Sequence, residues 1–80
     1  MKKFYLFKKE GKYFSYDLFY GELLELTISP IDYFEYKYHV EVHNDLDKLK
    51  DILESYSVSF RKQFQIVEFK FEIVETTINF

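Results

Sequence analysis

Two histidines and a glutamate alternate along residues 39–43, and imidazole and carboxylate groups are those that hold transition metals or move protons. On an extended strand, alternate residues share a face about 7 Å apart, so Glu41 could chelate an ion together with either His39 or His43. The two histidines would lie about 13 Å apart, too far to bind one ion together. We therefore interpret the three residues as the polar face of an amphipathic strand, and predict no bound metal and no cofactor.

Other catalytic groups are also poorly placed. The chain has no cysteine, which excludes a thiolate nucleophile, a thiolate metal site and a disulfide framework. Its 14 Asp and Glu residues stand at charged positions, and no pair lies in an apolar stretch that would raise a carboxyl pKa. A small sheet with one helix leaves little volume for a water-excluding pocket of about 300 Å³. The sequence thus predicts a protein that is not an enzyme.

The elements that position these residues predict an α+β fold with an antiparallel sheet of four to five strands. We expect residues 3–8 and 13–18 to form a hairpin, with Gly11 supplying the positive φ of its turn. Five apolar residues alternate with polar ones over residues 34–42, which predicts the clearest strand. A further strand over residues 65–75 completes the sheet.

One amphipathic helix is predicted over residues 44–56. Asn44 is a good N-cap, and Asp47 suits the positive end of the helix dipole. A single apolar stripe follows, so this helix is expected to pack on one face of the sheet. In the last strand, the apolar phase slips at Ile66 and again at Ile73, which predicts bulges.

Residues 16–28 fit two interpretations. They can form a strand over residues 22–28, or a helix whose N-cap is Ser15. Gly21 in the middle would cost the helix about 1 kcal/mol relative to alanine. We therefore favour the strand.

All 80 residues fit one domain, because chains divide only well beyond about 250 residues. No apolar run is long enough to span a membrane, and charges at residues 8–10 interrupt any signal-peptide core. We therefore expect a cytoplasmic protein that has no membrane partner.

Charge and aromatic residues point to a partner. Residues 17–54 carry ten acids and three bases, and residues 1–12 carry five lysines and one glutamate. An acidic surface suits a basic partner and steers the encounter with it. The 8 Tyr and 10 Phe residues are types enriched in protein interfaces. Because one helix cannot cover both faces of the sheet, we expect some rings to stay exposed.

The leading hypothesis is a small protein that binds a larger protein with a basic surface. Codon-biased composition, with many Phe, Tyr and Lys and few Gly and Pro, indicates a low-GC genome. Size and composition are those of a phage or mobile-element inhibitor, for example an anti-CRISPR protein that blocks the nucleic-acid channel of a host defence complex. The residues expected to bind the partner share the acidic side of the molecule: Tyr33, Glu35, Glu41, Asp47, Asp51 and Glu54.

Two alternatives remain open. One is a single-stranded nucleic-acid-binding protein, whose basic N-terminal hairpin neutralises phosphates and stacks its rings on bases. The residues of that site would be Lys2, Lys3, Phe4, Tyr5, Phe7, Lys8, Lys9 and Lys12. The other is a self-assembling subunit, a homodimer in which a second copy covers the spare aromatic face.

Overall fold

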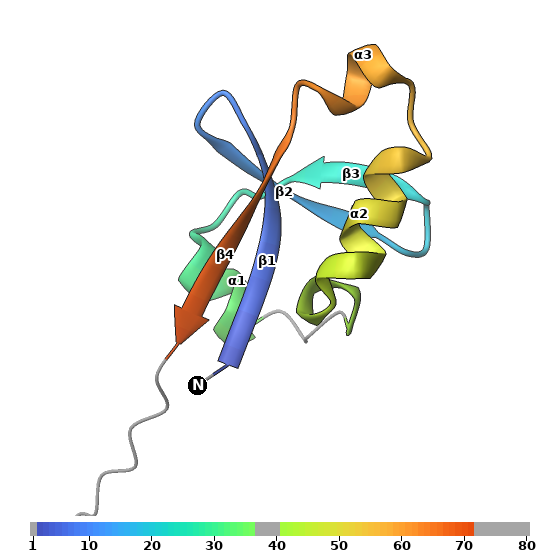
Figure 1. Cartoon of the computed structure of the whole chain (residues 1–80). Coiled ribbons are helices and arrows are strands. Elements are labelled where there is room, and N and C mark those ends of the chain that lie inside the picture. The colour runs from blue at the N-terminus through green and yellow to red at the C-terminus, as the bar shows by residue number, and fades with distance from the viewer. Residues whose placement is uncertain (1, 37–40, 72–80) are drawn as a thin grey trace, which may run out of the picture.

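The computed structural model describes residues 2–36 and 41–71, and four antiparallel strands form its centre (Figure 1). Their order across the sheet is β3-β2-β1-β4. Their bounds are Lys2–Lys9 for β1, Lys12–Asp17 for β2, Glu22–Glu25 for β3 and Gln65–Phe71 for β4. Together with its helices, the sheet gives the α+β fold that the sequence predicts.

β1 takes a central place because it is apolar on both faces. A hairpin joins it to β2, and Glu10 and Gly11 in the turn adopt positive φ of 51° and 76°. Glycine adopts such angles without strain, which is why the turn forms here. On its other side β1 pairs with β4. Phe4 and Leu6 point to one face of the sheet and Phe7 to the other, and all three are buried.

A helix, α1 (Pro30–Tyr36), replaces the first part of the strand predicted over residues 34–42. Two local features favour the helix over the alternation of apolar and polar residues. Pro30 stands at the first helical position, where its missing N–H costs nothing. The Ser29 hydroxyl accepts a hydrogen bond from the Asp32 N–H at 3.2 Å, as an N-cap does.

The strand prediction is also wrong where the described chain resumes. Glu41–Asn44 forms a 3₁₀-helix, η1, which leads into α2 (Leu46–Glu54). α2 is the amphipathic helix predicted over residues 44–56. Its N-cap is Asp45, whose side chain accepts hydrogen bonds from two N–H groups of the first turn, and not Asn44, which belongs to η1.

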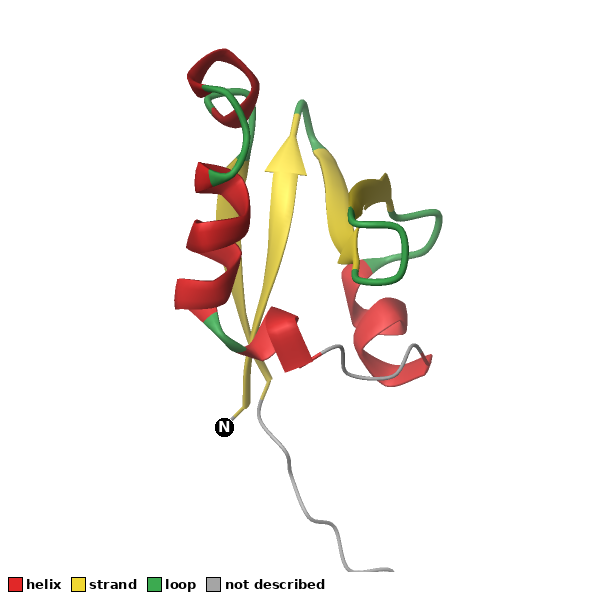
Figure 2. Cartoon of the chain, turned by 90° about the vertical axis from the view of Figure 1, so that its right-hand side faces the viewer, coloured by secondary structure: helices red, strands yellow, loops and turns green. Residues whose placement is uncertain are grey.

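Helices cover both faces of the sheet, as Figure 2 shows. On one face, α2 packs with η1 and the one-turn helix α3 (Val58–Arg61). The buried core there consists of Phe7, Val42, Leu49 and Phe64. On the other face, α1 covers a core of Phe4, Leu6 and Tyr33. The sequence predicts one helix on one face; the second cover, α1, comes from a segment interpreted as a strand.

β3 shows how residues 16–28 fold. They continue β2, turn at residues 18–21 and return as β3, so the strand interpretation is confirmed and the helix does not form. β3 ends at Glu25 and not at residue 28.

β4 keeps a continuous antiparallel register with β1. Phe7 pairs with Ile66 and Leu6 with Val67, so the bulge predicted at Ile66 does not occur. The end of the predicted strand, with the second bulge at Ile73, lies outside the described residues. None of the described helices is long and apolar enough to cross a membrane.

Candidate functional site

The acidic residues expected to bind a partner do not form one surface. Glu35 is exposed on α1, whereas Asp47, Asp51 and Glu54 are exposed on α2. These two helices lie on opposite sides of the sheet (Figure 2). Glu41 begins η1. A single partner could therefore contact only part of the expected set through one face.

Tyr33, the aromatic member of that set, is buried. Strand alternation would place it on the polar face, but as part of α1 it packs on the sheet with its ring centroid 5.9 Å from that of Phe4. Burial raises the pKa of the Tyr33 hydroxyl; a hydrogen bond with Ser15 lowers it, and the charge of Asp17 raises it. The structure thus makes Tyr33 a core residue whose hydroxyl is sensitive to the charge of Asp17.

The rings expected to stack on nucleic-acid bases are also in the core. Phe4 and Phe7 are fully buried on opposite faces of the sheet. Tyr5 is half-buried, and its carbonyl oxygen is hydrogen-bonded to His43. β1 is a central strand, so its apolar side chains build the core and offer no stacking platform.

The lysines of the same hairpin are distributed over both faces, mostly with partners. Lys8 lies over the ring of Tyr13 at 5.3 Å, and Lys9 lies over the ring of Phe64 at 5.5 Å. These rings belong to the cores on opposite faces. Two ion pairs, Lys3–Glu68 at 3.6 Å and Lys12–Glu25 at 3.4 Å, hold two more of the lysines, and Lys2 begins β1. The four lysines whose side chains are described therefore form no continuous basic face.

His43 is a buried structural residue and not a solvated one. Its side chain is 0 % exposed and lies among the rings of Phe4, Phe7 and Tyr33. Burial lowers its pKa, and the hydrogen bond to the Tyr5 carbonyl opposes this shift. The expectation that His43 lies on a polar strand face is wrong, and His39 lies outside the described residues.

The imidazole of His43 bridges β1 and β2 where their pairing stops. The β1–β2 ladder ends at Phe7↔Phe14, and the same register, continued by two pairs, would set Tyr5 opposite Tyr16. There Nδ1 lies 2.7 Å from the Tyr5 carbonyl oxygen, and Nε2 accepts from the Tyr16 N–H at 3.1 Å. Because Nε2 accepts, Nδ1 must carry the proton and donate. Both nitrogens are occupied, which leaves neither for a metal.

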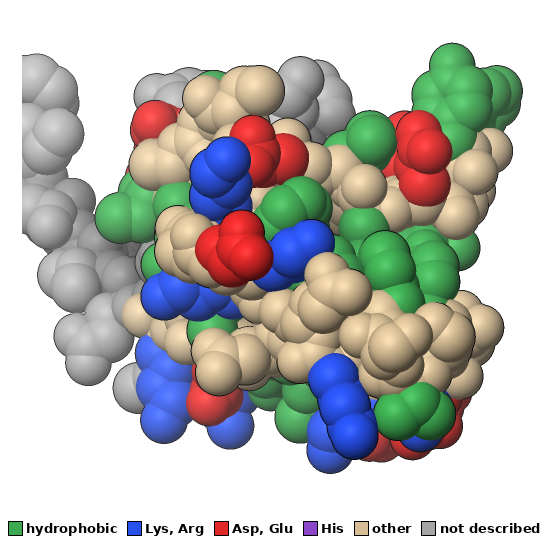
Figure 3. All heavy atoms as spheres, turned by 90° about the horizontal axis from the view of Figure 1, so that it is seen from above, with side chains coloured by type: hydrophobic (Ala, Val, Ile, Leu, Met, Phe, Trp, Pro, Cys, Tyr) green, Lys and Arg blue, Asp and Glu red, His purple; other side chains and the backbone are tan. Residues whose placement is uncertain are grey.

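Among the described residues, the most exposed apolar side chains form a turn that the sequence analysis did not identify. Leu18, Phe19 and Tyr20, which join β2 to β3, are 63 %, 87 % and 71 % exposed. We call these three residues the aromatic turn. Seen from above in Figure 3, hydrophobic side chains protrude at one corner of the molecule, on the side of this turn. The signal in the sequence is an apolar triplet directly before a turn glycine.

Hydrogen bonds to Asp17 hold the backbone of the aromatic turn. Oδ1 of Asp17 accepts from the N–H groups of Phe19 at 2.8 Å and Tyr20 at 3.3 Å, and its carbonyl accepts from Gly21 at 2.7 Å. Gly21 has a φ of 66°, which favours glycine. The two rings meet edge-to-face with centroids 4.9 Å apart. The turn therefore presents its rings in a defined arrangement.

The charged residues that flank the aromatic turn in the sequence are all acidic. Residues 17–36 contain no Lys, Arg or His, and their acids are Asp17, Glu22, Glu25, Asp32 and Glu35. Glu25 forms an ion pair with Lys12. Within the part of the chain that the structure describes, the other four acids have no ion-pair partner. Within the described residues, this side therefore combines an apolar projection with acids that have no ion-pair partner.

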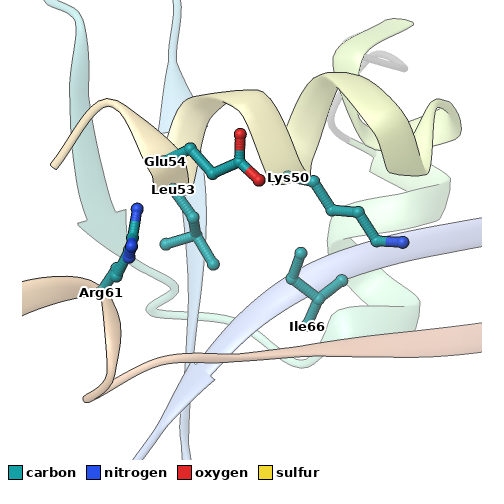
Figure 4. A pocket seen from close by; sticks show the side chains of 5 residues that line it. All are labelled: Lys50, Leu53, Glu54, Arg61 and Ile66. Carbon is teal, nitrogen blue, oxygen red and sulfur yellow. The ribbon is translucent and has the colours of Figure 1, made fainter. Parts of the chain in front are cut away.

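Pockets adjoin the helices in the part of the chain that the structure describes, and two of them concern us here. One, which we call the turn pocket, has a volume of about 430 Å³ between the start of the aromatic turn and α1. Its lining residues are Ser15, Tyr16, Asp17, Leu18, Phe19, Leu24 and Tyr33. The other, of about 260 Å³, lies between α2, α3 and β4 (Figure 4). It is lined by Lys50, Leu53, Glu54, Arg61 and Ile66. Among the described residues, no three His, Cys, Asp or Glu side chains are grouped to hold a metal.

Comparisons with protein-family models, with curated proteins and with solved structures found no match to this chain. Its function must therefore be inferred from its own residues. The features that need a functional explanation are the aromatic turn, the acids around it and the turn pocket beneath it.

Proposed function

We propose that this protein is a non-enzymatic binding protein that inserts its aromatic turn into an apolar, basic-rimmed pocket on a larger protein. The observation that carries the proposal is the exposure of Phe19 and Tyr20 on a turn that Asp17 holds by hydrogen bonds. Rigid aromatic side chains bury a large area at little cost in conformational entropy, which makes them the usual anchors of protein interfaces.

The charge around the turn supports a basic partner. Asp17, Glu22 and Asp32 lie in a segment without any basic residue, and none of them has an internal ion pair among the described residues. Complementary charge speeds association and disfavours acidic partners. The acidic residues on α2 lie on the far face of the sheet, so this proposal assigns the contact to the turn and α1.

A basic channel that holds nucleic acid is the kind of surface that this side would fit. Such channels present Lys and Arg side chains to phosphates. Together with size and composition, this supports the proposal that the protein is a phage or mobile-element inhibitor of a host nucleic-acid-handling or defence complex, of the anti-CRISPR kind. The acidic residues would take the place of phosphates, and the rings would add apolar contact.

Site-specific photocrosslinking tests the proposal. Phe19 or, as a matched control, Val58 is replaced by benzoylphenylalanine, and the protein is irradiated in nuclease-treated lysate of a low-GC bacterium. Val58 is also an exposed apolar residue but lies on α3. We expect a single protein adduct from position 19 that position 58 does not give.

Three outcomes would contradict the proposal: the same adducts from both positions, adducts only with nucleic acid in untreated lysate, or adducts only between copies of this chain. Once the crosslinked protein is identified, Phe19→Ser should weaken its binding at least about 30-fold, as the loss of an interface hot spot does. Val58→Ser should leave the affinity unchanged.

A further inference from the structure

The turn pocket is mainly apolar and has one charged lining residue. Leu18, Leu24 and the rings of Phe19 and Tyr33 contribute apolar lining, and Asp17 contributes a carboxylate. Among the residues that the structure describes, no basic residue lines the pocket. A neutral apolar ligand would bury this carboxylate without a partner, which is unfavourable, and an anion would be repelled.

Asp17 is fixed in place and retains a free oxygen. Its Oδ1 accepts the two N–H groups of the aromatic turn. No hydrogen bond or ion pair within the described chain uses Oδ2. The carboxylate is therefore positioned before any ligand arrives, and a binding group would not have to displace an existing partner.

A second negative charge stands across the strand pair. Asp17 is the direct antiparallel partner of Glu22, and residues in such pairs have Cβ atoms about 5 Å apart. Like charges at this separation destabilise a sheet, unless a cation is bound nearby. The described part of the chain supplies no lysine or arginine to either carboxylate.

Tyr33 adds an aromatic ring next to the carboxylate. Both side chains line the turn pocket. Burial raises the pKa of the Tyr33 hydroxyl most, and the charge of Asp17 also raises it. Its hydroxyl is occupied by Ser15. Cations bind favourably over aromatic rings, and a carboxylate on the same pocket wall adds Coulomb attraction.

We propose that the turn pocket binds a lysine or arginine side chain of the partner, with Asp17 as its counter-ion. The alkyl stem would lie against Leu18 and Leu24, and the cationic head would meet Asp17 beside the ring of Tyr33. This inference rests on the proposed function, because the cation would belong to the same partner that the aromatic turn contacts.

A titration with small cations tests the pocket without the partner. The ¹⁵N-labelled protein is titrated with the methylamides of Nα-acetyl-arginine and Nα-acetyl-lysine, and with the neutral analogues that contain citrulline and norleucine. We expect saturable amide shifts at residues 15–19, 24 and 33 with a cation, and binding about tenfold weaker or more with its neutral analogue. The stronger cation identifies the side chain that the pocket prefers.

Asp17→Asn is the decisive variant, because asparagine keeps an oxygen that can cap the turn but removes the charge. It should weaken binding of the cation about tenfold, whereas the matched control Asp51→Asn on α2 should have no effect. Equal binding of neutral analogues, unchanged binding by Asp17→Asn, or shifts centred elsewhere would overturn the inference. Because crosslinking from position 19 needs no bound cation, failure of the pocket and failure of the proposed function can be told apart.

Discussion

Two regions lie close together along the chain: Tyr16 of β2, which contacts His43, and the aromatic turn, which begins two residues later at Leu18. The first buries a polar side chain, and the second exposes apolar side chains. The Tyr16 N–H is bonded to a buried imidazole, so a polar ring is fully enclosed and both of its nitrogens are used. From Leu18 onward, three large apolar side chains extend into solvent. In both places the backbone is satisfied by a side chain, His43 in one and Asp17 in the other.

We expect the region around His43 to contribute to the stability of the fold, and the aromatic turn to contribute to binding. Enclosing a polar ring stabilises the fold only while every hydrogen bond is made. Exposing three apolar side chains contributes almost nothing to folding, since they bury little area in the molecule itself. Substitutions around His43 should therefore change the free energy of unfolding, and substitutions in the aromatic turn should change binding alone.

The largest loss of stability should come from the core next to His43. Leu49 of α2 is 0 % exposed, so Leu49→Ala leaves a cavity and should lower the free energy of unfolding by about 2–5 kcal/mol. Urea denaturation followed by circular dichroism measures this change. Val58→Ala, on the exposed face of α3, is the control and should change it by less than about 0.5 kcal/mol. Equal effects of the two substitutions would mean that α2 does not pack as described.

His43→Leu should be the next most damaging change. It keeps an apolar side chain in the space but leaves the Tyr5 carbonyl and the Tyr16 N–H without partners, each worth about 1–3 kcal/mol. Allowing for the apolar gain, we expect a net loss of about 2–4 kcal/mol.

Amide hydrogen exchange shows whether the bridge is the cause. The Tyr16 amide should exchange faster in His43→Leu relative to the amide of Phe14, which lies within the β1–β2 ladder. A variant as stable as the wild-type protein, with an equally protected Tyr16, would disprove the role of the bridge.

The burial of His43 could not be predicted from the sequence, because it depends on contacts between segments that are far apart in the chain. Alternation placed His43 on a polar strand face; its burial follows from a gap between β1 and β2 that only the assembled sheet creates. By contrast, Gly11 correctly predicts the hairpin, and the apolar stripe correctly predicts α2, because turn chemistry and helical periodicity are local.

The segment from residue 29 shows how two local signals can conflict. Ser29 and Pro30 form the capped start of α1, just before residues whose apolar and polar side chains alternate as in a strand. The alternation of apolar and polar residues after Pro30 favours a strand more strongly than the serine cap and the proline favour a helix. It therefore predicts a polar face for Tyr33, which is buried in the core. The exposure of the aromatic turn likewise depends on tertiary structure, since the same triplet within a strand would have been buried.

Acidic pH should lower the free energy of unfolding through the protonation of His43. Burial lowers the pKa of His43 in the folded protein, whereas in the unfolded chain histidine titrates near about 6.5. Below this pH the unfolded state binds more protons than the folded state. The free energy of unfolding therefore decreases as the pH is lowered from about 6.5 to the folded pKa, by at most about 1.4 kcal/mol per pH unit. Above about pH 6.5 this contribution is constant.

The measurement is urea denaturation between pH 5 and 8, with His43→Leu as the control that should lose this slope. Burial raises the pKa of the neighbouring Tyr33 hydroxyl further above that range. A wild-type slope equal to that of the variant would show that another group, and not His43, takes up the proton.

Phe19→Ser should have the smallest effect on stability and makes the sharpest comparison. Its side chain is 87 % exposed and contacts the ring of Tyr20, so the free energy of unfolding should change by less than about 0.5 kcal/mol. Differential scanning calorimetry beside His43→Leu measures the contrast directly. A loss above about 1 kcal/mol would mean that the ring packs against the protein's own chain, and the reason to propose a partner for it would disappear. An unchanged stability, together with at least about 30-fold weaker binding of the crosslinked protein, would assign the ring to binding alone.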